Sequence, residues 1–453
     1  MTNYQTPRGT NDIFGDEINK WHYLEALIRE ICFLYHYQEI RTPIFEHTEV
    51  FKRANDSSDM VNKEMYSFED NGGRSLTLKP EGTAGVVRCF VENKLYSLAD
   101  LPLKVFYLSP IFRYERPQKG RMRIHHQFGV EVLGEKNPML DAEVISLGYS
   151  TVSALGLQDL QVLINTLGDE ESRANYRKAL KEHFHSHLDT MCPDCQRRYE
   201  QNPLRILDCK VDKDHVAMQN LPDINDYLTP ASKDYFNQVL NGLKMLGIDY
   251  EISSKLVRGL DYYTETVFEV ISNNREMGAQ STIFGGGRYD KLVEYFGGPS
   301  MSGIGFGMGI ERLLVALEAE NITIGEPEEL DLYIMALDRK YQPEALALAT
   351  IARSNGFAAE MDYQGRSMKA QFKAADRTNA KIIALLGEDE VLNSKITLKN
   401  TKTKEQITLS YFDLVDQLNK WILADEHDHH EDETEQTECD ENDCACHDHQ
   451  HQH

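Results

Sequence analysis

One stretch, residues 112–134, combines the residue types that bind an anion. It places five Lys and Arg residues and two Glu residues between two apolar runs, with a loop at 116–120 that carries both a Pro and a Gly. If 112–115 and 126–133 are antiparallel strands, alternation places one set of side chains on a single face. That set is Arg113, Glu115, Gln127, Gly129 and Glu131. The arginine would bind phosphate oxygens with two N–H groups, and the Glu and Gln oxygens would accept hydrogen bonds from an amine or an imidazole. A charged hairpin at a solvated sheet edge is the alternative.

Two other regions could also hold a ligand. Arg258 precedes a glycine and is flanked by Leu and Val, so a rigid element would present its guanidinium with little beside it. A structural ion pair with Asp261 is the alternative. The segments 284–290 and 303–314 are rich in glycine, which lets the backbone approach a ligand closely. The second segment does not fit the dinucleotide-binding motif G-x-G-x-x-G, because Met308 stands where the third glycine would be.

These segments resemble the signature motifs of one family. Phe112-Arg-Tyr-Glu-Arg-Pro, followed by His126-Gln-Phe-Gly-Val-Glu, resembles the second motif of class II aminoacyl-tRNA synthetases in its histidyl-tRNA synthetase form. Residues 256–263, Leu-Val-Arg-Gly-Leu-Asp-Tyr-Tyr, match residue for residue the motif that distinguishes histidyl-tRNA synthetases from other class II members. Residues 303–314 are similar to the third class II motif. The resemblance covers residues 1–424 and implies an α+β catalytic domain with an antiparallel, class II synthetase-like sheet.

The resemblance also implies an activity and a set of contacts. The implied enzyme activates histidine with ATP and Mg²⁺ to histidyl-adenylate and transfers it to the 3′ end of tRNA(His). Arg113 and Arg258 would be fixed cations on the reacting α-phosphate, and Arg312 would contact the outgoing phosphates. The implied histidine contacts are Glu81, Gly82, Thr83, Arg113, Gln127, Glu131, Arg258, Tyr262, Tyr263 and Tyr289. The implied ATP contacts are Arg113, Glu115, Arg121, His125 and Arg312. Taken alone, the turn at 81–83 is also typical of ordinary helix capping.

One position departs from the family. Where the family usually has an aromatic ring, commonly Phe, this chain has His125. If that side chain stacks on adenine, the imidazole keeps a flat face but offers less contact area. We therefore expect ATP to bind more weakly here than in relatives.

The elements that must position these residues divide the chain into several parts. An amphipathic helix over 17–35 begins the catalytic domain, and long charged helical segments follow from residue 170. The expected parts are a catalytic domain at 1–169 and 251–325, a helical insertion at 170–250, an anticodon-binding α/β domain with a mixed sheet at 330–424 and a tail at 425–453. Residues 39–46 resemble, with the helix before them, the first class II motif, which implies a homodimer; a simple bend at Pro43 is the alternative.

A line of basic residues lies in the expected anticodon-binding domain. Their spacing of three, four and four residues places them on one helix face. They are Arg366, Lys369, Lys373 and Arg377. A solvated helix is the alternative, whereas the resemblance implies contact with tRNA.

Two groups of residues could bind a metal. In the insertion, Cys192, Cys195, Cys209 and His215 provide four potential zinc ligands, although three thiols can also be structural. The tail has seven His and three Cys residues among its acids, and we expect it to be disordered because it lacks apolar residues. Its candidate ligands for Zn²⁺ or Ni²⁺ are His427, His429, His430, Cys444, Cys446 and His447. A solubilising or metal-buffering acidic tail is the alternative.

Charge and composition limit the partners. The net charge is −25, of which twelve acidic residues in 425–453 contribute −12 and the other 424 residues carry −13. A tRNA contact would therefore use local basic surfaces and not a field over the whole molecule. No stretch approaches the roughly 20 apolar residues of a membrane span, and the polar start is unlike a signal peptide, so we expect a cytoplasmic protein.

A second function would also fit this fold. A catalytically inactive, synthetase-like regulatory subunit of the ATP phosphoribosyltransferase type keeps the catalytic-domain fold. Such proteins typically lose the Arg258 motif and the anticodon-binding domain. Because this chain has both, the sequence favours the active ligase.

Overall fold

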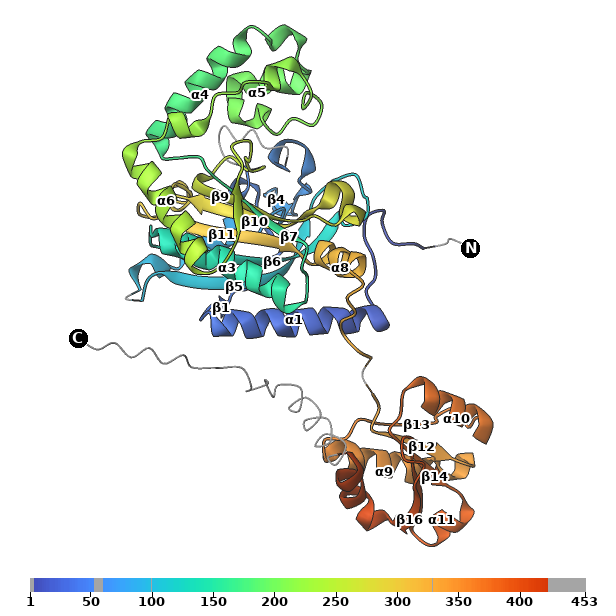
Figure 1. Cartoon of the computed structure of the whole chain (residues 1–453). Helices are drawn as coiled ribbons and strands as arrows, with labels where there is room; N and C mark the ends of the chain where they lie inside the picture. Colours follow the sequence, from blue (N-terminus) through green and yellow to red (C-terminus); the bar gives the residue numbers. More distant parts are fainter. Residues whose placement is uncertain (1–3, 53–59, 99, 328, 423–453) are drawn as a thin grey trace, which may run out of the picture. The chain divides into compact units, whose positions relative to one another are not determined.

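The computed structural model describes residues 4–52, 60–98, 100–327 and 329–422 (Figure 1). The chain divides after Gly325 into two units. The first unit holds the residues predicted to bind histidine and ATP, and the second holds those predicted to bind tRNA.

An eight-stranded sheet forms the centre of the first unit. In spatial order its strands are β1 (Gln38–Glu39), β5 (Leu103–Phe112), β6 (Ile124–Leu133), β11 (Gly303–Gly309), β10 (Thr282–Tyr289), β9 (Thr264–Ser272), β7 (Leu160–Thr166) and β8 (Tyr250–Ile252). Neighbouring strands are antiparallel, except for the two parallel pairs at the edges, β1 with β5 and β7 with β8. The predicted α+β class with a largely antiparallel sheet is confirmed.

The predicted hairpin is present, but its first strand ends at Phe112 and does not continue to residue 115 as expected. β5 pairs with β6 along its whole length, from Leu103 to Phe112. Residues 112–115 were expected to form a strand, but only Phe112 belongs to β5. Arg113 and Glu115 follow the end of β5. The strand runs through Pro110 because β1 pairs only with Val105 and Phe106, and a proline is tolerated where a strand has one neighbour.

Four helices cover one face of this sheet. They are α1 (Asp16–Leu34), α3 (Pro138–Ala154), α6 (Pro230–Met245) and α8 (Ile310–Ala319) (Figure 1). Phe128, Phe268 and Phe306 of the sheet are buried in the core that these helices complete. Because side chains alternate along a strand, their neighbours in sequence face the opposite side of the sheet.

A smaller sheet leads into the turn at 81–83. It contains β2 (Phe45–His47), β4 (Ser75–Leu78) and β3 (Ser67–Glu69), in that order. From β4 the chain enters α2 (Thr83–Glu92), which shares a small apolar core with α7 (Leu292–Tyr295). Pro43 lies between β1 and β2, where the chain passes from the large sheet to the small one.

The predicted insertion contains a helical module with its own core. This core includes buried residues of α4 (Glu170–His185) and α5 (Pro193–Gln201) and extends to Leu228. In contrast, α6 packs against α3 in the main core, and β8 pairs with β7. Within 170–250, only the part up to about residue 228 is therefore separate from the catalytic sheet, and the exact domain limits stay a prediction.

The second unit is the predicted α/β domain. Its five-stranded sheet has the order β13 (Ala359–Met361), β12 (Leu332–Ala336), β14 (Ile382–Leu386), β15 (Lys395–Asn400) and β16 (Gln406–Ser410). The first three strands are parallel and the last two are antiparallel to their neighbours, so the sheet is mixed. The helices are α9 (Gln342–Ser354), α10 (Met368–Arg377) and the short α11 (Glu388–Leu392). In the parts of both units that the structure describes, every helix is too short or too polar to cross a membrane.

Candidate active site

A row of glycines forms the floor of a pocket on the face of the sheet opposite the helices. Gly129 of β6 pairs with Gly307 of β11, which pairs with Gly285 of β10. Tyr107 stands beside Gly129 at one end of this row, and Glu269 stands beside Gly285 at the other. Without side chains in the middle of the row, a ligand can lie against the backbone.

Glycine is needed where polar side chains cross this floor. A Cβ atom at Gly305 would lie 2.1 Å from Oε2 of Glu131, and one at Gly307 would lie 2.2 Å from Nε2 of Gln127. Both distances are well below van der Waals contact, so a larger residue would displace Glu131 or Gln127. The glycines of β11 therefore set the positions of two acceptors in the pocket.

Glu131 is the most buried acceptor at one end of the pocket, with 1% of its surface exposed. It accepts hydrogen bonds from Oγ1 of Thr83 at 2.6 Å and from the hydroxyl of Tyr289 at 2.5 Å. Burial raises the pKa of Glu131 to about 8. At neutral pH the carboxyl group is thus mostly protonated while the pocket is empty, and a bound cation would favour its ionised form.

Glu81 and Thr83 contact the pocket. Oε2 of Glu81 accepts a hydrogen bond from the hydroxyl of Tyr262 at 2.9 Å, and Thr83 donates to Glu131. The residue at the N-cap of α2 is Gly82, which has no side chain with which to cap the helix. These bonds favour a ligand-binding role for 81–83 over capping.

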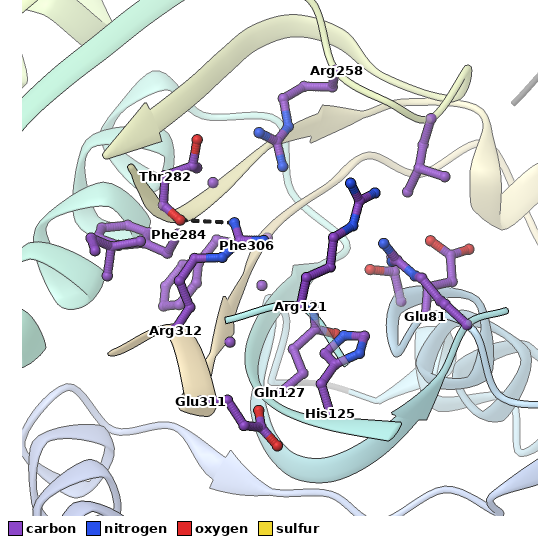
Figure 2. A pocket seen from close by; sticks show the side chains of 18 of the residues that line it. Glu81, Arg121, His125, Gln127, Arg258, Thr282, Phe284, Phe306, Glu311 and Arg312 are labelled. Atoms are coloured by element: carbon purple, nitrogen blue, oxygen red, sulfur yellow. Dashed lines mark hydrogen bonds between the residues drawn. The ribbon is translucent and has the colours of Figure 1, made fainter. Parts of the chain in front are cut away.

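Four arginines surround the rest of the pocket, and each has a fixed partner. Figure 2 shows the guanidinium groups of Arg121, Arg258 and Arg312 around one space. Nε of Arg113 donates to the carbonyl of Pro80 at 2.8 Å, and Nη1 of Arg312 donates to the carbonyl of Thr282 at 2.8 Å. Arg121 forms an ion pair with Glu115, and Arg258 forms one with Glu269. The pairing of Arg258 with Glu269 differs from the Asp261 pair considered as its structural alternative.

The electrostatics of this cluster indicate uncompensated positive charge. Burial lowers the pKa of Arg312, and the charges of Arg121 and Arg113 lower it further. Burial, followed by the charges of Arg113 and Arg312, lowers the pKa of His125 to about 3. An anion bound between the arginines would relieve this repulsion. The pocket thus places a buried acceptor group next to an anion site.

Comparison with known proteins identifies this arrangement. A family model described as Histidyl-tRNA synthetase matches residues 9–313, and one described as Anticodon binding domain matches residues 331–421. A histidine–tRNA ligase from Oceanobacillus iheyensis is 51% identical over 417 residues, which cover 92% of this chain and 97% of the relative. This chain belongs to the histidyl-tRNA synthetase family.

Solved structures agree with the family. The apo histidyl-tRNA synthetase of S. aureus superimposes with a TM-score of 0.79 at 41% identity, over 92% of this chain and 100% of that one. An ATP phosphoribosyltransferase regulatory subunit/histidyl-tRNA synthetase from Bacillus halodurans C reaches a TM-score of 0.59 at 22% identity, over 83% of this chain and 97% of that one. The second likeness shows a shared fold alone, so the regulatory alternative has less support.

The structure brings together nearly all of the residues that the synthetase motifs predicted. The predicted residues that line the pocket are Glu81, Thr83, Arg113, Glu115, Arg121, His125, Gln127, Arg258, Tyr262, Tyr263, Tyr289 and Arg312. Glu131 bonds to two of them, and Gly82 lies against the ring of Tyr107. Their individual roles toward histidine and ATP stay predictions.

Several lining residues were missed by the sequence prediction. They are Tyr107, Leu260, Thr282, Phe284, Phe306 and Glu311. Figure 2 labels the last four. Tyr107 donates to Oε1 of Gln127 at 3.3 Å, and it pairs with Gly129 in the hairpin. The correct strand register would have placed Tyr107 on the same face as Gln127 and Glu131. Glu311 accepts from the backbone N–H of His126 at 2.9 Å, a contact that has no signal in the sequence.

One predicted tRNA-binding residue is placed differently from the others. Arg366 precedes α10, forms an ion pair with the buried Asp362 and donates to the hydroxyl of Tyr333 at 3.1 Å. The predicted stripe of four is therefore wrong at Arg366, because the helix begins only at Met368. Lys369, Lys373 and Arg377 lie within α10 and are exposed.

The predicted metal ligands are also corrected at one position. Cys192, Cys195 and Cys209 lie together, but their fourth neighbour is Asp212, and His215 lies outside the group. The ring of His215 accepts from the backbone of Ala217 through Nδ1, and its Nε2 lies 3.1 Å from Oγ1 of Thr190. The candidate ligands of the tail lie outside the described residues.

Proposed function

We propose that this chain is a histidine–tRNA ligase, which makes histidyl-adenylate from histidine and ATP and transfers the histidyl group to the 3′ end of tRNA(His). The observation that carries this proposal is one pocket in which the buried acceptor Glu131 adjoins four arginines, only two of which, Arg121 and Arg258, form close ion pairs with carboxylates. One end suits a cationic amine and a ring N–H, and the other suits phosphates.

Recognition of histidine would use the acceptors at one end of the pocket. Glu81, Gln127 and Glu131 offer oxygen atoms, and Tyr262 and Tyr289 position two of these side chains. When the substrate ammonium binds, Glu131 gives up its proton and becomes its counter-charge. An analogue without the matching N–H groups would leave buried acceptors unpaired, which a hydrogen-bonding site rejects strongly.

Activation of histidine would depend on the fixed arginines. The histidine carboxylate attacks the α-phosphorus, negative charge builds on the phosphate oxygens and pyrophosphate leaves. Arg113 and Arg258 would stabilise that charge, and Arg312 would hold the outgoing phosphates. Their partners Pro80, Glu269 and Thr282 fix the guanidinium groups in advance, so little reorganisation is needed as the charge develops.

Mg²⁺ would accompany ATP, as the family implies. Mg²⁺ keeps several waters and binds mainly through substrate phosphates with one or two carboxylates. The pocket carboxylates Glu115, Glu269 and Glu311 are of the type that this donor set needs. Each of them already has a partner, since Glu115 and Glu269 pair with arginines and Glu311 accepts from His126. When bound, the ion supplies charge neutralisation on the phosphates, and the arginines position them.

The tRNA and a second subunit would bind outside this pocket. Exposed Lys369, Lys373 and Arg377 give α10 a basic face for tRNA in the anticodon-binding domain, and the helical insertion could lie over the bound tRNA.

A homodimer is supported by large apolar side chains exposed on the first motif. They are Phe33, Leu34, Ile44 and Phe45, exposed by 79%, 72%, 47% and 47%. Molar mass by light scattering tests the dimer.

Aminoacylation of tRNA(His) transcript with labelled histidine tests the function. We expect charging that requires ATP and Mg²⁺ and that fails with the other nineteen amino acids. A folded protein that charges no tRNA and activates no amino acid would instead support the regulatory-subunit alternative.

A further inference from the structure

A second group of reactive side chains lies in the helical insertion. The ligand atoms of Cys192, Cys195, Cys209 and Asp212 all lie within 4.8 Å of one another. We refer to these four residues as the Cys3Asp cluster. Three thiols with one carboxylate are a donor set that Zn²⁺ binds, because zinc accepts sulfur and oxygen ligands in a closed four-coordinate site.

The distances within the Cys3Asp cluster fit a tetrahedral zinc site. The sulfurs of Cys192 and Cys209 lie 3.7 Å apart. Two sulfurs bound to one tetrahedral Zn²⁺, each at about 2.3 Å, would lie about 3.8 Å apart. Sγ of Cys209 lies 3.8 Å from Oδ2 of Asp212. These two separations match those of a bound site, and all other pairs of ligand atoms lie within 4.8 Å.

The surroundings also suit a bound cation. Cys195, Cys209 and Asp212 are buried, with 0%, 5% and 7% of their surfaces exposed. Backbone N–H groups support two ligands, since Cys192 N donates to Oδ2 of Asp212 at 3.0 Å and Asp212 N donates to Sγ of Cys209 at 3.4 Å. Such hydrogen bonds orient metal ligands from the second coordination sphere. A bound Zn²⁺ would also stabilise the buried carboxylate of Asp212.

The segment between the first and last ligands contacts the active site. It contains Arg198 of α5 and the short helix η5 (Pro203–Ile206). Nη1 of Arg205 in η5 donates to the carbonyl of Arg258 at 2.8 Å, and Nη1 of Arg198 donates to the carbonyl of Arg205 at 3.1 Å. Asn202 also donates to Asp261, at 2.9 Å. The cluster thus lies at both ends of a segment that supports the backbone carrying Arg258.

We propose that the Cys3Asp cluster binds one structural Zn²⁺, which fixes residues 192–212 and, through Arg205, helps to position Arg258. The zinc site itself is independent of the function proposed above. Its effect on Arg258 rests on that function.

The first test is the zinc content of the purified full-length chain and its variants. Because every variant keeps the tail, any metal bound there cancels in the comparison. Cys89→Ser changes a thiol outside the cluster and is the control. Wild type and this control should each hold one additional tightly bound zinc ion per chain compared with the double variant Cys192→Ser/Cys209→Ser. Asp212→Cys keeps four ligands and should retain the zinc. Equal zinc content in wild type and the double variant would overturn the proposal.

A second measurement serves if the double variant does not fold. Asp212→Asn keeps the size of the side chain but removes its charge, and competition with a chromophoric chelator should show zinc binding at least about tenfold weaker than in wild type. Cobalt in place of zinc should give the visible absorption bands of a tetrahedral thiolate site, weaker in Asp212→Asn. Unchanged affinity and an unchanged cobalt spectrum in this variant would also overturn the zinc site.

The link to Arg258 has its own test. Zinc removal from wild type should slow histidine-dependent pyrophosphate exchange several-fold and should have no further effect on Arg205→Ala, which lacks the bond to Arg258. Equal slowing in both proteins would disprove the link through Arg205, and it would leave the zinc stoichiometry unaffected.

Discussion

The pocket and helix α10 are basic regions that place their cations in opposite environments. In the pocket, Arg113, Arg258 and Arg312 each bond to a carbonyl or carboxylate, and mutual repulsion helps lower the pKa of Arg312. On α10, Lys369 and Lys373 are exposed to solvent. The first arrangement holds charge at fixed positions in a poorly solvated place, and the second presents mobile charge that salt screens.

This difference separates two tasks that an arginine or lysine can perform. Fixed, partly desolvated cations stabilise charge that develops during a reaction, because they need no reorganisation at that moment. Exposed cations instead contribute to affinity for a polyanion by releasing counterions, and their effect falls as the salt concentration rises. Substitution in the pocket should therefore affect catalysis, whereas substitution on α10 should affect the salt dependence of tRNA binding.

The largest effect is expected for Arg113→Ala. Removing one preorganised donor should lower the rate of pyrophosphate exchange by about 10²- to 10³-fold. The matched control is Lys373→Ala, which removes an exposed cation and should leave exchange unchanged. Similar losses in both variants would contradict the distinction between the two regions.

A smaller effect is expected for Glu131→Gln. Loss of a charged hydrogen bond of about 1.5–3 kcal/mol should raise the KM for histidine by about 10- to 150-fold. Because burial raises the pKa of Glu131 to about 8, the empty site must lose a proton when the ammonium binds. The KM for histidine should thus fall as the pH rises toward 8.

Glu131→Gln provides the reference for the pH dependence of the KM for histidine. Exchange measured from about pH 7 to 8.5 should show the fall in KM for wild type and a flatter profile for Glu131→Gln, since the substrate titrates equally in both. Parallel profiles would show that Glu131 does not titrate on binding.

Substitutions on α10 should change how the affinity for tRNA depends on salt concentration. Lys369→Ala/Lys373→Ala should reduce the slope of log affinity for tRNA against log salt concentration by about 2, or roughly one for each lost phosphate contact. Titrations of labelled tRNA at several salt concentrations measure the slope, and pyrophosphate exchange should not change. An unchanged slope would mean that α10 does not contact the tRNA backbone.

The smallest effect is expected at His125. Burial and the nearby arginines lower its pKa to about 3, so the imidazole is neutral at any pH at which the enzyme is assayed. A larger aromatic ring in His125→Phe should lower the KM for ATP by at least about twofold through greater contact with adenine. The KM for histidine is the internal control, and a smaller gain for ATP would argue against stacking.

The sequence predicted the residues of the pocket better than the contacts between them. Motifs identified Arg258, Gln127 and Glu131. Strand alternation places Gln127 and Glu131 on one face of β6, and close glycines leave room for all three side chains. Tyr107 was missed because its role depends on the register of β5 against β6, which the sequence pattern placed too late.

Other errors arose where the order of residues does not determine their distance. His215 was expected to complete the thiol group, but the turn after Cys209 brings Asp212 there instead. Arg366 has helical spacing to Lys369, yet the buried carboxylate of Asp362 holds it before the helix starts. Both outcomes depend on loop conformation and on partners distant in sequence, which residue spacing alone does not show.

Histidine-dependent exchange between ATP and labelled pyrophosphate, compared for wild type and Arg258→Ala, tests the account most directly. We expect wild type to exchange with histidine alone among the amino acids, and Arg258→Ala to lose that exchange by at least about 100-fold while remaining folded. Full exchange in Arg258→Ala would contradict the proposed role of the fixed cations, and a lack of exchange in folded wild type would contradict the ligase function itself.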